Sequence, residues 1–448
     1  MTLAFHSDET SPLVEALFAE LGIAPGTLER AIDGRDEMLG FLAATCEGDR
    51  ERALFQYFRS GASIADSLGQ VLRWRFGDLG RIGKLLDFAS GYGRVTRFLV
   101  REIPPQRIWV ADVYADGVRL QKERFGVHGL VSTLQPEEFS CGERFDAILV
   151  TSLFTHLPEE RFVAWLRVLL GLLAPGGMLV FSAHSPEVLP PGAEMPAGGI
   201  RFQETSESGS LAKSDYGSTW VTEEFVRAAL ERAAGSGASL HRVERGLCNF
   251  QDLYLAIPEP EVDFSTLCFH GEPQLFLESA ELSPDGRLAL EGWAAVRSGA
   301  VREVEAVLDR ERLAVAPVDE PRPDVAEFLG GDRYLRSGWR CSLPLPAAAS
   351  RSASILLLRV KDARNAGHPL WIGSLEAALL VSSRNQATWL RGELRHAEIV
   401  HAEERARAAL EAEALRARIA AMEASRFWKL RNVWFRFKKL VGLVEDAG

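Results

Sequence analysis

Apolar residues are spaced differently in successive parts of the chain. Over residues 1–80 they recur three and four positions apart, as at Leu13, Leu17 and Leu21, which is typical of amphipathic helices. Over residues 81–258 short apolar or β-branched runs alternate with amphipathic stretches, the pattern of parallel βαβ units. We therefore predict a helical N-terminal cap followed by an α/β domain.

The second half of the chain predicts two more parts. Short alternating strands separated by Gly, Pro and Asp turns indicate a small β-sandwich over residues 262–380. Over residues 386–445 the composition changes to Ala, Glu, Arg and Leu, which predicts a long helix. A short coiled-coil seam, which would support a homo-oligomer, follows Ala408, Ala412, Leu415, Ile419 and Met422. Polar residues interrupt the seam upstream, so a lone solvated helix is the alternative.

Length, composition and charge exclude several classes of protein. The 448 residues correspond to about three domains of usual size. A content of 47% hydrophobic and 25% charged residues excludes collagen-like, mucin-like and wholly disordered chains. With 51 basic and 62 acidic side chains, the net charge of −11 would repel a polyanion, so we expect no nucleic-acid partner.

The cysteines and the N-terminus bear on the compartment. The five cysteines lie far apart and form no C-x-x-C pair, so we expect no metal site and a reducing environment. The first residues lack the basic start and apolar run of a secretory signal, and no apolar stretch reaches the ~20 residues of a membrane span. These features together predict a cytoplasmic protein.

The most informative segment is residues 84–94, KLLDFASGYGR. It predicts a buried strand that ends near Asp87, a turn containing Gly91 and Gly93, and then a helix. Such a turn brings backbone close to a ligand at the N-terminus of a helix. Thr96 stands where a dinucleotide fingerprint has its third glycine, which makes the turn less suited to a pyrophosphate. An NAD-dependent oxidoreductase is therefore only an alternative.

This segment resembles the first motif of the class I S-adenosylmethionine-dependent methyltransferases, with Ala89 in place of the usual first glycine. The resemblance covers about residues 50–258 and includes the phrase FQYFRSG at residues 55–61, ahead of the first strand. It implies a Rossmann-like, seven-stranded and mostly parallel sheet whose final antiparallel strand is residues 252–257. It also implies S-adenosyl-L-methionine as the cofactor and methyl transfer as the reaction.

The next apolar strand, residues 108–111, ends at Asp112. An acid about 20 residues past the glycine turn can accept hydrogen bonds from both ribose hydroxyls. A helix N-cap or a solvated loop acid is the alternative, and Asp116 is a nearby competitor that is better placed to cap a helix. No acid occurs at residues 132–136, where many relatives contact adenine. The predicted cofactor-binding residues are Asp87, Ala89, Gly91, Gly93, Asp112 and Thr151.

His156 is the predicted catalytic residue. It lies just beyond the strand predicted over residues 145–152, at the sheet edge where ligands bind. An imidazole of ordinary pKa is a general base near neutral pH, and a histidine in a similar phrase serves as base in sugar methyltransferases of this fold. Alternatively, His156 caps the following helix and shapes the pocket. His184 is a weaker candidate, and residues 186–219, which include Tyr216, are expected to form a substrate-selecting lid.

The C-terminal parts suggest a setting for the reaction. The phrases EGWA, RPDV and SGW at residues 291–294, 322–325 and 337–339 look like a module found beside bacterial polysaccharide enzymes. Trp293 and Trp339 would either stack on sugars or form the sandwich core. These features favour a hydroxyl or amine of a sugar in a cell-envelope glycan as the methyl acceptor. A non-catalytic scaffold in a glycan-assembly complex is the alternative.

The last predicted feature is a basic and aromatic tail. Residues 426–440 hold six basic residues, five aromatic residues and no acid. On a helix the apolar residues share one face, which is the pattern of peripheral contact with the inner membrane. Docking onto a protein helix is equally compatible with this pattern.

Overall fold

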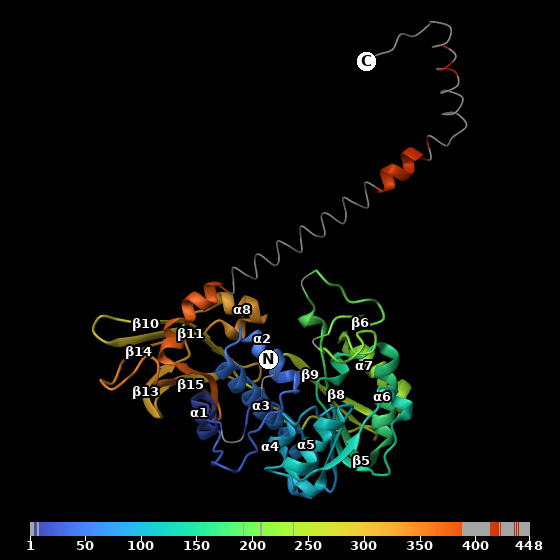
Figure 1. Cartoon of the computed structure of the whole chain (residues 1–448), viewed down its shortest axis with the longest axis horizontal. Helices are drawn as coiled ribbons and strands as arrows, with labels where there is room; N and C mark the ends of the chain where they lie inside the picture. The colour runs from blue at the N-terminus through green and yellow to red at the C-terminus, as the bar shows by residue number, and fades with distance from the viewer. Residues whose placement is uncertain are drawn as a thin grey trace. The chain divides into compact units, whose positions relative to one another are not determined.

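The computed structural model divides into two units, residues 1–379 and 380–448 (Figure 1). The residues that it describes are 4–6, 9–190, 192–206, 208–235, 237–387, 413–420, 422, 434, 436 and 438. In the second unit residues 413–420 are helical, with Leu415 and Ile419 exposed. Most of the predicted coiled coil and tail, residues 386–445, lies outside the described residues.

Three helices begin the first unit: α1 (Pro12–Glu20), α2 (Glu37–Thr45) and α3 (Arg50–Phe76). Each starts after a polar side chain that accepts a hydrogen bond from an N–H of the first turn, namely Ser11, Asp36 and Asp49. Such a cap contributes about 1 kcal/mol to helix stability. The apolar faces of α1 and α3 meet in a buried cluster that includes Leu17, Phe18 and Phe58.

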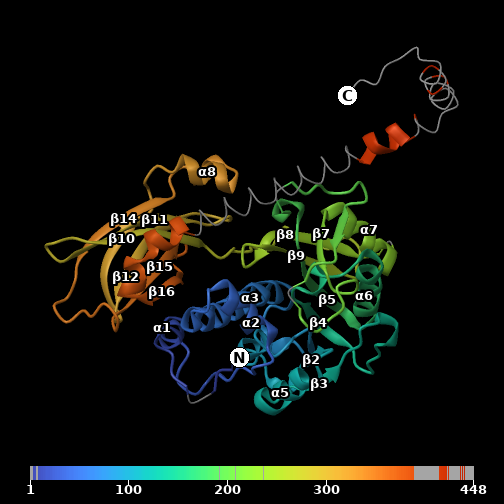
Figure 2. The same cartoon turned by 45° about the horizontal axis from the view of Figure 1, so that its top comes forward.

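The central sheet has seven strands in the order β3-β2-β1-β4-β5-β9-β8 (Figure 2). The five strands from β3 to β5 are parallel, whereas β9 runs antiparallel to both of its neighbours. This confirms the predicted class I methyltransferase topology. The bounds are β1 (Leu85–Phe88), β2 (Ile108–Asp112), β3 (His128–Val131), β4 (Phe145–Val150), β5 (Leu173–Ala183), β8 (Ser239–Leu247) and β9 (Gln251–Ile257).

Helices cover both faces of this sheet. Successive side chains of a strand point to opposite faces, so Leu86 and Leu85 of β1 enter different buried clusters. The cluster of Leu86 contains α6 (Glu159–Gly171) and α7 (Glu223–Ala234), and that of Leu85 contains α3 with α5 (Ala115–Phe125). The long helix of the N-terminal cap is therefore also a layer of the α/β fold.

The segment expected to lack periodicity, residues 186–219, contains a short antiparallel ladder. Strand β6 (Ile200–Gln203) pairs with β7 (Ser218–Val221). The four residues of β6 are only half-buried, and their sequence, IRFQ, contains no apolar run that would predict a strand. The ladder places residues 204–206 and 208–217 between its two strands.

Two further sheets follow, ordered β10-β11-β14 and β13-β12-β15-β16. They agree with the predicted accessory β-sandwich. Trp339 is only 1% exposed, which favours its assignment to the core, whereas Trp293 is half-buried and stacks on Phe276. The bounds are β10 (Gln274–Leu282), β11 (Arg287–Ala295), β12 (Val301–Leu308), β13 (Glu311–Pro317), α8 (Pro323–Leu329), β14 (Gly338–Pro344), β15 (Ile355–Asp362), β16 (Gly367–Ser374) and α9 (Leu375–Leu379).

The sandwich packs on the N-terminal helices. Val307, Leu357 and Ile372 belong to the same buried cluster as Leu17 and Phe18 of α1. Apolar side chains from opposite ends of the first unit thus form one core.

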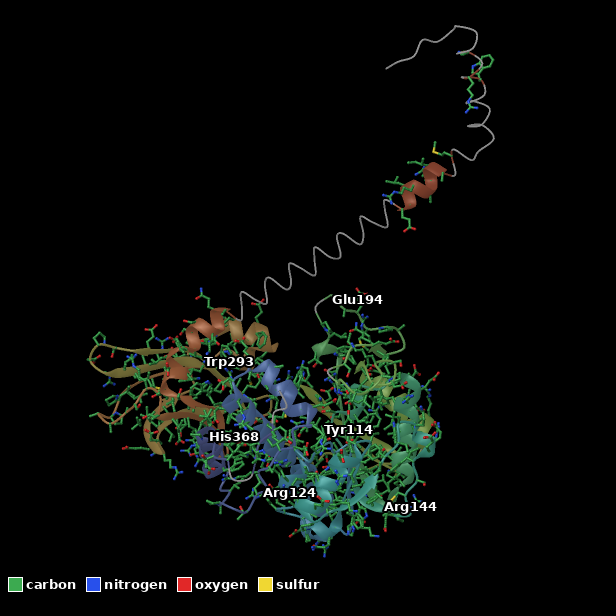
Figure 3. All side chains as sticks on the ribbon, viewed as in Figure 1. Tyr114, Arg124, Arg144, Glu194, Trp293 and His368 are labelled. Carbon is green, nitrogen blue, oxygen red and sulfur yellow. The ribbon has the colours of Figure 1, made fainter. Side chains whose placement is uncertain are left out.

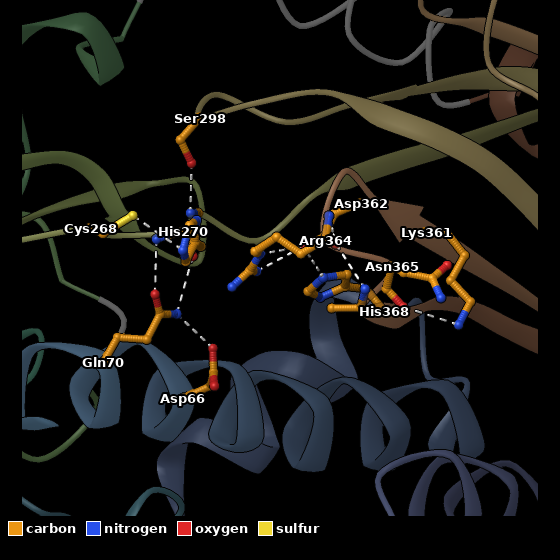
Figure 4. A network of polar contacts seen from close by, with 12 residues as sticks. Asp66, Gln70, Cys268, His270, Ser298, Lys361, Asp362, Arg364, Asn365 and His368 are labelled. Atoms are coloured by element: carbon orange, nitrogen blue, oxygen red, sulfur yellow. Dashed lines mark hydrogen bonds and ion pairs between the residues drawn. The ribbon is translucent and has the colours of Figure 1, made fainter. Parts of the chain in front are cut away.

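Polar contacts add to this packing. Arg359 of β15 forms an ion pair with Glu20 at 2.6 Å. Gln70 of α3 exchanges two hydrogen bonds with the backbone of His270, at 2.9 and 3.1 Å (Figure 4). The segment that leads into the sandwich is therefore held against α3. Among the described helices, none is both long enough and apolar enough to cross a membrane.

Candidate active site

A cavity opens at the carboxyl ends of β1, β2 and β4, where open α/β sheets bind ligands. Five of the six residues predicted to bind the cofactor line it, namely Asp87, Ala89, Gly91, Asp112 and Thr151. Gly93 is buried beside it and packs toward Phe125 and Gln121. Tyr114, another lining residue, is half-buried and is labelled in Figure 3, where Arg144 is seen at the edge of the first unit.

The turn after β1 adopts left-handed backbone conformations at three alternate residues. The φ angles are 59° at Ala89, 57° at Gly91 and 80° at Gly93. Ala89 carries a Cβ, so this conformation costs about 1 kcal/mol there. No atom of the residues that the structure describes lies within 4 Å of the position that a Cβ on Gly91 would take. The turn therefore leaves open space beside its backbone, which a ligand can fill.

Asp87 lies at the bottom of this turn and is fully buried. Its Oδ2 accepts a hydrogen bond of 2.7 Å from the hydroxyl of Thr96, the residue in place of the third glycine. Burial raises the pKa of Asp87 to about 7, although the Thr96 hydrogen bond opposes the shift. The cavity is therefore lined by a carboxyl group that changes its charge near neutral pH.

Asp112 joins the turn to the start of α5. Its Oδ2 accepts from the N–H of Gly91 at 2.7 Å, and its Oδ1 accepts from the N–H of Tyr114 at 2.9 Å. Asp116 is half-exposed, pairs with Arg35 and does not line the cavity. The structure thus brings Asp112, and not its competitor, to the cavity.

His156 follows the one-turn 3-10 helix Leu153–Thr155 after β4. Its Nδ1 lies 2.7 Å from the carbonyl oxygen of Gly217, and the N–H of Gly217 donates to the His156 carbonyl at 2.8 Å. A carbonyl oxygen only accepts, so Nδ1 is the protonated nitrogen. The ring is buried and stacks on Tyr216, with 4.1 Å between ring centroids. Tyr216 lines the cavity and His156 does not.

The contacts also bear on two predictions from the sequence: that His156 alternatively caps the following helix, and that His184 is a weaker candidate for the base. Helix α6 begins after Pro158 without a side-chain cap, so His156 does not cap it. His184 packs against Trp220 and Phe250. Burial and the neighbouring His156 lower the pKa of His184 to about 4, which keeps its ring neutral at physiological pH.

The cavity has two further walls: the start of α2, which sequence reasoning missed, and the segment over residues 186–219, which it expected to form a lid. The start of α2 contributes Asp36, Glu37 and Met38, and the segment over residues 186–219 contributes Ser208, Leu211, Ala212, Asp215 and Tyr216. Two sets of contacts hold that segment in place. Ser210 donates to Glu37 at 3.0 Å and contacts the Tyr114 hydroxyl, and Asp215 pairs with Arg161 at 2.8 Å. No local pattern in the sequence indicates these long-range contacts.

Residues 86–179 match a family model described as a methyltransferase domain. These residues belong to a methyltransferase domain. The matched residues include the glycine turn and Asp112, and their strands β1 to β4 belong to the seven-stranded, mostly parallel sheet that the sequence predicted. S-adenosyl-L-methionine is therefore the cofactor, and the open space at Gly91 together with the acids at Asp87 and Asp112 fits a cationic nucleoside.

Several solved methyltransferases have a similar fold. A sugar N-methyltransferase from a Streptoalloteichus species is 18% identical, with a TM-score of 0.34 over 45% of this chain and 88% of the other. An amino pentose methyltransferase from Micromonospora echinaspora is 19% identical, with a TM-score of 0.33 over 44% and 90%. A putative O-methyltransferase from Nostoc punctiforme is 17% identical, with a TM-score of 0.34 over 55% and 67%. A search of curated proteins finds no match.

The pKa of Asp87 predicts how cofactor binding by the methyltransferase domain depends on pH. The cationic methionine part favours the ionised carboxylate, but this group is largely protonated below pH 7 in the empty cavity. Binding at lower pH must therefore release a proton, which weakens it. We expect the affinity for S-adenosylmethionine to rise about tenfold from pH 6 to pH 8. Calorimetry at several pH values measures this, and Asp87→Asn should flatten the dependence. A flat wild-type profile would contradict the assignment.

Proposed function

We propose that the methyltransferase domain methylates a hydroxyl or amine of a sugar in a cell-envelope glycan, with His156 as the general base. The observation that carries the proposal is the orientation of His156 beyond β4. With the proton on Nδ1 held by the Gly217 carbonyl, Nε2 is the basic nitrogen of the ring. The stacked Tyr216 connects this histidine to the cavity wall.

The reaction needs little apparatus beyond orientation and removal of a proton. S-adenosylmethionine, when bound, supplies the methyl group of its sulfonium. The acceptor oxygen or nitrogen forms the new bond to the methyl carbon as the sulfur–carbon bond breaks, which leaves S-adenosylhomocysteine. The acceptor proton passes to His156. The domain holds the reactants in line and keeps water out, and such positioning can account for much of the rate.

The segment that contacts His156 is the proposed lid. Gly217 is hydrogen-bonded to His156 at both its N–H and its carbonyl, and Asp215, two residues earlier, pairs with Arg161. A shift of this segment would therefore move Tyr216 and change the access of an acceptor to His156. This coupling is our reason for placing acceptor selection in the lid.

The accessory sandwich supports the choice of a glycan acceptor. Phe276 is 43% exposed and stacks on the half-buried Trp293, at a centroid distance of 6.1 Å. Aromatic side chains that are partly exposed on a rigid sheet can stack on sugar rings. The buried Trp339 has no such role, and Arg322 of the RPDV phrase pairs with Glu278 and Asp324 to brace α8.

Methyl transfer to fractionated envelope glycans tests the proposal. The protein is incubated with S-adenosylmethionine that carries a labelled methyl group, and the glycan fractions are hydrolysed to monosaccharides. We expect the label in an O-methyl or N-methyl sugar with the wild-type protein, and far less with His156→Ala. Protein that binds the cofactor but labels no glycan fraction would contradict the proposed acceptor.

A further inference from the structure

We propose that Arg94 binds the α-carboxylate of the cofactor's methionine part and that Ser60 positions its guanidinium. The proposal rests on S-adenosylmethionine as the cofactor and is independent of the acceptor and of His156. Three observations carry it: the position of Arg94, its lack of a protein carboxylate as a partner, and the charges of the cavity.

Arg94 follows directly on Gly93 and lines the cavity together with Asp87. Helix α3 approaches it closely, because a Cβ on Gly61 would lie 2.5 Å from the Arg94 carbonyl oxygen. The neighbouring Ser60 accepts a hydrogen bond of 2.8 Å from Nη1 of Arg94. The Ser-Gly pair of the FQYFRSG phrase thus lets α3 reach the turn and orient the guanidinium.

The two arginines that line the cavity differ in their partners. Arg161 pairs with Asp215 at 2.8 Å and also donates to the carbonyl of Leu134. Arg94 donates to Ser60 and forms no ion pair within 4 Å with a described carboxylate. Burial raises the pKa of Asp36, and the charge of Arg94 opposes that rise from a greater distance. The positive charge of Arg94 is therefore available to a ligand, whereas that of Arg161 is already paired.

The cofactor has a charge that matches. S-adenosylmethionine carries a positive sulfonium, a positive ammonium and a negative carboxylate at neutral pH. The acids that line the cavity are Asp36, Glu37, Asp87, Asp112 and Asp215, and Asp215 is paired with Arg161. Among the described lining residues, Arg94 is the other arginine. A planar guanidinium can bind a carboxylate through two parallel hydrogen bonds, which makes the pair strong and directional.

The order of the strands places Arg94 at the end of the cavity where the methionine part of the cofactor is expected. Asp112, the predicted ribose ligand, ends β2, and the lining residues Ser132 to Leu134 follow β3, at the outer edge of the sheet. Arg94 follows β1 on the inner side. A cofactor with its ribose at Asp112 and its base toward β3 therefore extends its methionine part toward β1 and α3.

The test compares two ligands that differ only in the carboxylate: S-adenosylmethionine and its decarboxylated form. Calorimetry without an acceptor gives both dissociation constants for each variant. We expect Arg94→Met to weaken S-adenosylmethionine binding about 10- to 100-fold and to leave the decarboxylated ligand within about twofold. Arg94→Lys should lose less, because it keeps the charge but not the planar fork. Ser60→Ala should shift the same selectivity by a smaller factor.

The matched control is Arg161→Met, which removes the other cavity arginine and should alter the two affinities by the same factor. Retained binding of the decarboxylated ligand shows that the Arg94 variants are folded. Equal losses for both ligands in Arg94→Met, or no loss for either, would overturn the proposal. Failure of methyl transfer to glycans would leave this result untouched, since no acceptor is present.

Discussion

Replacing His156 by alanine is expected to lower turnover by a factor of about 10² to 10⁴ and to leave the affinity for S-adenosylmethionine nearly unchanged. In its proposed role the side chain removes a proton from the acceptor, and it does not line the cavity at the carboxyl ends of the strands. At saturating S-adenosylmethionine, where the titration of Asp87 no longer limits cofactor binding, the wild-type rate should fall on the acid side as the imidazole becomes protonated. This acid limb should be absent in the variant. Steady-state kinetics over a range of pH, with calorimetry for the cofactor, measures both effects.

His184→Ala is the matched control, because that ring is close to His156 but stays neutral through burial. It should keep the acid limb of the wild type. The alternative role of His156 is to anchor the lid through Gly217. Under that role the variant would melt at a lower temperature and keep both its turnover at saturating acceptor and its acid limb. That pattern would exclude His156 as the base.

Asp112→Ala should weaken S-adenosylmethionine binding by a factor of about 10 to 150, which corresponds to about 1.5–3 kcal/mol for a buried charge-assisted contact. The ribose would lose its acceptor, and the N–H groups of Gly91 and Tyr114 would lose the carboxylate that now holds them. Both losses act on the cofactor site, while the packed sheet beneath it is unchanged. Calorimetry measures the affinity, and thermal melting checks the fold.

Asp116→Ala serves as the control for this variant, since it removes a carboxylate four residues away that pairs with Arg35 outside the cavity. It should bind the cofactor as the wild type does. If Asp116→Ala weakened binding and Asp112→Ala did not, the ribose assignment would be wrong.

The central sheet could be predicted because its inner strands are buried on both faces. Residues 85–88 and 145–150 are apolar except for one aspartate in each segment. Such runs are typical of strands that helices cover on both faces. The outer strand β3 and the short β6 are half-exposed and carry no such run. Their place depends on pairing with distant strands, which local patterning does not encode.

The part of the candidate site that could be predicted is the part formed by residues 87–112, from the end of β1 to the end of β2. The glycine turn and Asp112 lie at the ends of strands, where chain order alone places them at one edge of the sheet. Asp36 and Asp215 reach the same cavity from a helix start and a long loop. The strain at Ala89 was also hidden, because an alanine in a glycine motif suggests only an added methyl group, whereas the backbone is left-handed there.

The shared core of α1 and the sandwich bears on how such chains are assembled in evolution. Phe18 and Leu17 of α1 are covered in part by Leu357 and Ile372 from the other end of the first unit. A methyltransferase that lost the sandwich by exchange of gene segments would expose the apolar face of α1 to water. One that gained it would need an apolar face on α1 for the sandwich to pack on. The helix and the sandwich must therefore change together, so the natural unit of exchange includes the N-terminus as well as the C-terminal strands.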